Sequence, residues 1–228
     1  LTRIRGRIDT LTQKGLYFSY MLYNGWSVDN TGRGSGDVWQ HHPYNSLNNV
    51  NSLNGDPGAD GDGEETHSTT SNNAYARQVV YVKWLIDSLN NYDNLIWEIC
   101  NEMPEGYSWV RALIDTIHNY EARTKPRQHL VWLTSDWTFL NDSLLTSNAE
   151  LVAPGQGASN GTAWETNPPD SGGRKVIIVD TDHQWGIGGD ADWAWQTFLS
   201  GNHPVFMDGW DTIGIRHDGT EDFKGKVG

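Results

Sequence analysis

The segment 94–104, NLIWEICNEMP, decides how the rest of the chain is interpreted. Its apolar run is typical of a buried strand in a parallel sheet, yet it contains Glu98 and ends in Asn101 and Glu102. A carboxylate at the end of a buried strand costs free energy unless it has a partner or a chemical task. Alternate side chains of a strand share a face, so Glu98 and Glu102 point the same way. Glu98 lies deeper in the protein, and we therefore expect it to be paired or hydrogen-bonded there. Glu102, nearer the strand end, is then the candidate for acid–base chemistry.

Working outward, short apolar runs alternate with amphipathic helical patterns, and a long polar loop spans 25–73. This alternation predicts an α/β protein with a parallel sheet. Gly15 follows the first helical pattern and is expected to cap it. We expect helices at 1–15, 74–90, 107–124 and 190–200, and strands at 16–24, 94–102, 128–136, 149–155, 174–183 and 203–211.

Composition restricts the partners. The formal net charge is −13, from 16 basic and 29 acidic residues, which argues against nucleic acids and anionic membranes. No apolar run approaches the ~20 residues of a membrane span, and no signal peptide is visible. The single cysteine, Cys100, excludes an internal disulfide and a multi-cysteine zinc site. The glycines of 30–37 open no helix, which argues against a nucleotide site. No obligate protein partner is inferred.

Polar or aromatic residues follow the C-terminal end of most expected strands, where a (β/α)8 barrel builds its site. The chain also has 12 tryptophans, several of them just after apolar runs. A flat apolar ring with one N–H donor suits the faces and edges of sugar rings. These observations predict a carbohydrate groove, to which Trp26, Trp137, Trp164, Trp185 and Trp210 are candidates.

The segment 95–104 resembles the fourth-strand motif of the clan of (β/α)8 glycoside hydrolases that includes family 5 cellulases and mannanases. The segments 175–190 and 198–211 resemble the last two strands of bacterial members of that clan. The resemblance implies a single catalytic domain over 1–228, an incomplete (β/α)8 TIM barrel in which strands 3 to 8 are present and strands 1 and 2 are missing. We therefore expect the natural protein to be longer at both ends.

By this resemblance the protein is a glycosidase that cleaves O-glycosidic bonds of a plant-type polysaccharide or oligosaccharide, secreted or periplasmic, with no cofactor needed for catalysis. Glu102 would be the acid/base, and Asn101 would bind the sugar 2-hydroxyl. The clan's nucleophile is a Glu, but 175–212 contains none, so Asp182 or Asp180 is the candidate, with Glu165 as a third. Carboxyl groups about 5–5.5 Å apart would indicate a retaining enzyme, and roughly 6.5–9.5 Å an inverting one. Further substrate contacts are expected from His41, His42, His183, Asp208 and the aromatic candidates.

The loop 54–67 suggests a second chemistry. Asp56, Asp60, Asp62 and Glu64 offer oxygen ligands at close spacing, interleaved with glycines, although they match no complete EF-hand pattern. A structural Ca²⁺ is therefore expected there, with a solvated acidic loop as the alternative.

Two other functions remain open. A metal-dependent hydrolase would use Asp180, Asp182 and His183, with the His41–His42 pair as further ligands. A non-catalytic carbohydrate-binding barrel would explain why the expected nucleophile Glu is missing.

Overall fold

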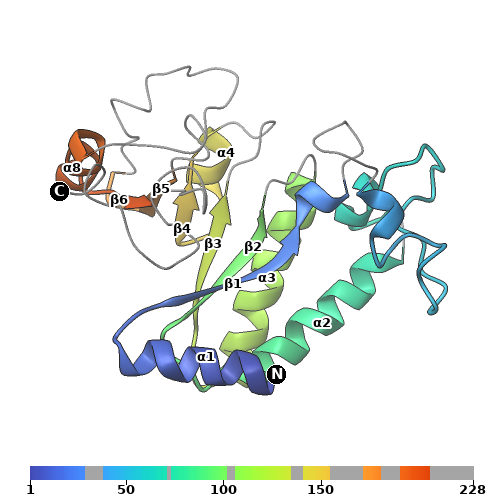
Figure 1. Ribbon diagram of the computed structural model, residues 1–228, viewed down its shortest axis with the longest axis horizontal. Coiled ribbons are helices and arrows are strands. Elements are labelled where there is room, and N and C mark those ends of the chain that lie inside the picture. The colour runs from blue at the N-terminus through green and yellow to red at the C-terminus, as the bar shows by residue number, and fades with distance from the viewer. Residues whose placement is uncertain are drawn as a thin grey trace, which may run out of the picture. The chain divides into compact units, whose positions relative to one another are not determined.

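A computed structural model describes residues 1–28, 38–70, 73–101, 106–134, 141–154, 172–180 and 191–205, except for the side chains of Trp26, Asn141, Asp142, Asp180 and Ala191. In these ranges six strands form one sheet in the order β1-β2-β3-β4-β5-β6 (Figure 1). By its internal contacts the chain divides into two compact units, Leu1–Trp132 and Leu133–Gly228. The strands are β1 Phe18–Asn24, β2 Leu95–Asn101, β3 Leu130–Thr134, β4 Leu151–Ala153, β5 Val176–Asp180 and β6 His203–Val205.

The first unit is built around β1 and β2, which pair in parallel from Phe18↔Leu95 to Asn24↔Asn101. β2 also pairs in parallel with β3, with Ile96 opposite Leu130. The predicted helices appear as α1 Thr2–Gln13, α2 Ala74–Leu89 and α3 Tyr107–Thr124. The described part of the long loop contains the short 3₁₀ turns η1 Gly25–Ser27, η2 Trp39–His41 and η3 Glu64–His67. No helix in the described part of the chain has the length and apolar character that a membrane crossing requires.

The core of this unit follows from the amphipathic patterns of α2 and α3. Each helix buries apolar residues three or four positions apart, such as Leu85 and Leu89 in α2 and Leu113 and Ile117 in α3. The two helices contact each other, and α3 also contacts β2, in which Trp97 is fully buried. Burying one Leu or Ile side chain contributes about 1.5–3 kcal/mol, so these stripes supply the main stabilisation of the unit.

α1 ends as the sequence predicts. The N–H of Gly15 donates to the carbonyl of Thr12 at 3.0 Å, and the N–H of Leu16 donates to the carbonyl of Leu11 at 3.0 Å. Gly15 has φ +68°, the left-handed conformation that a Schellman cap requires.

The second unit contains α4 Asn141–Thr146, β4, β5, α8 Ala191–Leu199 and β6. β4 pairs in parallel with β5, and β5 with β6. The helix α4 was not predicted, because its six residues lack a full amphipathic period. Residues 206–211 of the strand expected at 203–211 lie outside the described residues.

The α/β class is confirmed, but the expectation of an incomplete (β/α)8 barrel is wrong. Closing a barrel needs strands that continue around a circle with a fixed tilt and stagger. The described residues contain six strands, the longest of seven residues and the shortest of three, and β1 and β6 are the two edges of an open sheet. Polar residues at the carboxyl ends of the strands did not discriminate between the two architectures, because open parallel sheets place ligands there as well.

Candidate functional site

The carboxyl ends of β1 and β2 meet at one edge of the sheet. Asn24 ends β1 and Asn101 ends β2, and the two residues are register partners. Asn101 is partly exposed, whereas the six preceding residues of β2 are all buried. The structure therefore places Asn101 where the sequence predicts, at the point where β2 emerges from the core.

A hollow of about 610 Å³ opens beside this edge, within the first unit. Such a volume falls in the range of small-molecule sites, roughly 300–1,000 Å³. Among the described residues, no Asp, Glu, Lys or Arg lines it, and most of the lining is aromatic, aliphatic or imidazole. The lining residues are Leu22, Tyr23, Asn24, Ser27, Val38, His41, His42, Pro43, Tyr44 and Tyr81.

His42 is held in a defined protonation state. Its ring stacks on Trp39, with centroids 5.0 Å apart and 26° between the planes. The backbone N–H of Tyr44 donates to His42 Nδ1 at 3.1 Å, so Nδ1 is an acceptor and Nε2 carries the proton of the neutral ring. Burial lowers the pKa of His42 to about 4, so the ring is neutral at pH 7.

The phenols of the hollow are neutral as well. Burial, and then the nearby Tyr44, raises the pKa of Tyr23 above its ordinary value, and burial is also the main cause of the raised pKa of Tyr81. Tyr23 Oη donates to the carbonyl of Gln78 at 3.2 Å, which ties β1 to α2. The candidate site therefore combines neutral phenols with the neutral imidazole of His42.

Asparagine side chains hold the wall of the hollow in place. Asn45 Nδ2 donates to the carbonyl of Trp39 at 3.2 Å, Asn48 Nδ2 to that of His42 at 3.2 Å, and Asn49 Nδ2 to that of Pro43 at 2.7 Å. These bonds replace the ladder of a helix or sheet, which explains the Asn-rich composition of the loop. Trp39 is 3% exposed and forms the small buried core of this wall.

Glu98 has a structural role, as predicted. It is 6% exposed, and Ser19 Oγ donates to its Oε2 at 3.0 Å across the β1–β2 pair. A buried carboxylate with such a donor holds the strands together and is withdrawn from solvent.

Of the other predicted residues, His41 and His42 line the hollow together, and Tyr44 and Tyr81 are lining residues that the sequence analysis missed. Tyr44 follows His42 closely enough to have been suspected, whereas nothing in α2 marked Tyr81. Asp180 ends β5 and Trp26 lies in η1, but their side chains are not described. Glu102, Trp137, Trp164, Glu165, Asp182, His183, Trp185, Asp208 and Trp210 lie outside the described residues.

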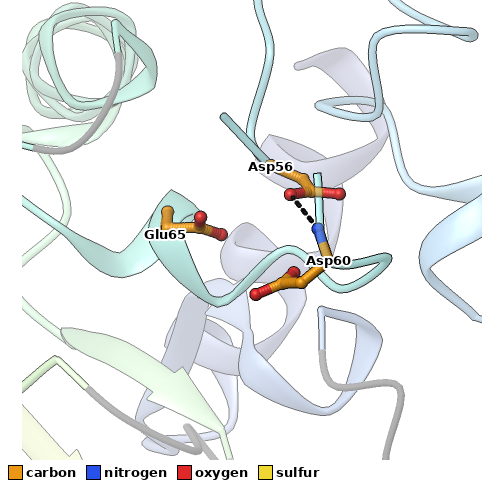
Figure 2. Close-up of side chains that lie close together, drawn as sticks. All are labelled: Asp56, Asp60 and Glu65. Atoms are coloured by element: carbon orange, nitrogen blue, oxygen red, sulfur yellow. Dashed lines mark hydrogen bonds between the residues drawn. The ribbon is translucent and has the colours of Figure 1, made fainter. Parts of the chain in front are cut away.

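The acidic loop brings together a set of carboxylates that differs from the predicted one (Figure 2). Single oxygens of Asp56, Asp60 and Glu65 lie within 4.8 Å of one another, a spacing that could hold a cation. Asp62 Oδ1 instead accepts the backbone N–H of Glu64 at 3.2 Å. Glu65 was missed because the turn η3, which brings its side chain toward Asp56 and Asp60, was not predicted.

Comparisons of the chain with protein-family models, with curated proteins and with solved structures found no match.

Proposed function

We propose that the protein is a glycoside hydrolase, with Glu102 as the acid/base and Asp182 or Asp180 as the nucleophile. The observation that carries the proposal is the position of Asn101, at the carboxyl edge of β2 and opposite Asn24, which lines the aromatic hollow. Glu102 is the next residue of the chain. Ligands of parallel α/β sheets bind outside the carboxyl ends of the strands, so the proposal does not need a closed barrel.

The hollow supports a sugar as the ligand. Pyranose rings present apolar C–H faces to aromatic side chains and hydroxyls to hydrogen-bonding groups. Tyr44 and Tyr81 offer such faces, and Asn24, Ser27 and the Nε2–H of His42 offer polar partners. A neutral plant-type polysaccharide or oligosaccharide outside the cell is the substrate that we propose, in line with the resemblance of 95–104 to cellulases and mannanases.

The proposed reaction is double displacement. Protonated Glu102 donates its proton to the glycosidic oxygen while the Asp carboxylate attacks the anomeric carbon, so the C–O bond to the leaving group breaks as the glycosyl–enzyme bond forms. Glu102, now ionised, then takes a proton from a water molecule that attacks the same carbon and releases the Asp. Asn101 would hold the 2-hydroxyl during both steps.

The first prediction concerns Glu102→Gln, which keeps the size of the side chain but can no longer act as a general acid or base. We expect a loss of roughly 100- to 10,000-fold in kcat, because general acid–base catalysis is worth about that much. The measurement is reducing-sugar release from a panel of β-glucans, mannans and pectic fractions. Glu105→Gln, a second glutamate of the same segment, is the matched control and should keep wild-type turnover.

Other outcomes would identify a different function. A wild-type chain that binds the polysaccharide and hydrolyses nothing in the panel would be a carbohydrate-binding protein. Turnover that is abolished by chelation and unaffected by Glu102→Gln would indicate metal-dependent hydrolysis instead.

A further inference from the structure

A cluster of buried polar groups lies at the amino-terminal edge of β2 and β3, away from the hollow. Glu121 of α3 is fully buried, and His129, one residue before β3, is 6% exposed. Asn90, at the end of α2, and Trp97 of β2 complete the cluster, which we call the His129 cluster. All its members belong to the first unit.

Glu121 is the common acceptor of this cluster. Its Oε1 accepts from His129 Nδ1 at 2.7 Å, Trp97 Nε1 at 3.1 Å and Asn90 Nδ2 at 3.4 Å. Its Oε2 accepts the backbone N–H of His129 at 2.7 Å. One carboxylate thereby links α3 to the end of α2, to β2 and to the start of β3.

The second ring nitrogen of His129 also faces an oxygen. His129 Nε2 lies 2.6 Å from the backbone carbonyl of Tyr92, and a carbonyl can only accept. A neutral imidazole carries one N–H, so in either tautomer one of its nitrogens would set a lone pair against an oxygen at 2.6 or 2.7 Å. Glu121 receives three further donors, from Trp97, Asn90 and the backbone N–H of His129, which favours its ionised form. Against an ionised Glu121, only the doubly protonated ring satisfies both contacts.

We propose that His129 is held in the fold as an imidazolium, and that its buried ion pair with Glu121 makes the packing of the first unit dependent on pH. This inference is independent of the proposed function. It assigns a charge state and a pH response to a part of the fold that contributes nothing to the hollow.

The charges around the pair set the direction of this response. Burial opposes the charge of His129, but its bonds to Glu121 and to the Tyr92 carbonyl prevail over burial and over the nearby Arg127 and raise its pKa. Burial likewise opposes the charge of Glu121, but the donors on His129, followed by Trp97, lower its pKa. Asn90 and Trp97 are uncharged.

The direction in which stability changes with pH follows from the linkage between proton binding and folding. A raised pKa on His129 stabilises the fold fully below the unfolded value of about 6.5, and this contribution is lost as pH rises through the folded pKa. A lowered pKa on Glu121 stabilises the fold above about 4.5 and is lost as pH falls through its folded value. The ion pair therefore contributes its full stabilisation between about pH 4.5 and 6.5.

The test uses the full chain labelled with ¹⁵N in its histidine rings. We expect one of the 8 histidines to keep two protonated ring nitrogens at pH 7.5, and its signal to vanish in His129→Gln. Between pH 6.5 and 9 the wild-type Tm should fall more steeply than that of His129→Gln, because only wild type loses the stabilising charge of His129. His203→Gln, which removes an exposed histidine, should keep the wild-type slope.

If His129→Gln fails to fold, the wild-type spectrum still decides. A folded wild-type chain in which every histidine shows a neutral ring by pH 7 would overturn the proposal. Equal slopes of Tm against pH in wild type and in a folded His129→Gln would overturn it as well.

Discussion

At the scale of single residues, burial keeps the imidazole of His67 neutral in the core. It is 4% exposed, and its ring lies against Trp109 with centroids 4.5 Å apart. Among the residues that the structure describes, its Nδ1 has no hydrogen-bond partner, which is uncommon for a buried nitrogen. Burial, and then the nearby His42, lowers the pKa of His67 to about 3.

This neutral state predicts an acid sensitivity that His67→Phe should remove. The unfolded chain binds the imidazole proton below about pH 6.5 and the folded chain only near pH 3, so wild type loses stability as pH falls between these values. At pH 4.5 the loss from this residue amounts to about 2.5 kcal/mol. Phe keeps the aromatic contact with Trp109 and has no nitrogen to protonate.

Urea unfolding at pH 7 and at pH 4.5 measures the difference. We expect His67→Phe to match wild type at pH 7, or to exceed it by about 1 kcal/mol, since a buried unsatisfied group is removed. It should be clearly the more stable protein at pH 4.5. An acid loss that persists unchanged in His67→Phe would show that other groups cause it.

At the scale of elements, the start of α3 depends on a glycine. Gly106 has φ +109°, and a Cβ placed there would lie 2.4 Å from the carbonyl oxygen of His67. Gly106→Ala should therefore cost about 2 kcal/mol or more and lower Tm by roughly 4–8 °C. Gly6→Ala, inside α1 where a Cβ meets nothing within 4 Å, is the control and should stabilise by about 0.5–1 kcal/mol. Two variants with the same effect on Tm would contradict this reading of the backbone.

The acidic loop carries the prediction of a structural Ca²⁺, with a changed set of ligands. Asp56 Oδ1 accepts the N–H of Asp60 at 3.2 Å, and Glu65 Oε1 accepts the N–H of Gly58 at 3.1 Å, which fixes the carboxylates around one point. We expect millimolar Ca²⁺ to raise Tm in wild type and in Glu64→Gln, and to have little effect in Glu65→Gln. Calorimetric titration and thermal unfolding measure this, and no rise in Tm for wild type would refute the cation.

At the scale of the whole molecule, local patterns predicted where the helices and strands lie, but not whether the sheet stays open or closes into a barrel. The helices expected at 74–90 and 107–124 match α2 and α3 within a residue, because amphipathic periodicity is a local property that tertiary packing then uses. Barrel closure depends on which strands pair at the two edges, and no single segment encodes that. The expectation of a barrel came from the resemblance and from the polar residues at the strand ends. Neither of these indicates whether the sheet closes.

In the candidate site, too, some features were determined by the sequence and others only by the tertiary structure. The apolar run before Asn101 by itself determined that this residue would emerge at the carboxyl end of a buried strand, and it singled out Glu98 as a partnered internal carboxylate. Only the tertiary structure brought Tyr81 of α2 into the hollow that His42 also lines, replaced Asp62 and Glu64 by Glu65 in the acidic cluster, and set His129 between Glu121 and the Tyr92 carbonyl. Burial periodicity is written in neighbouring residues, whereas these contacts join segments that meet only when helices and loops pack against the sheet.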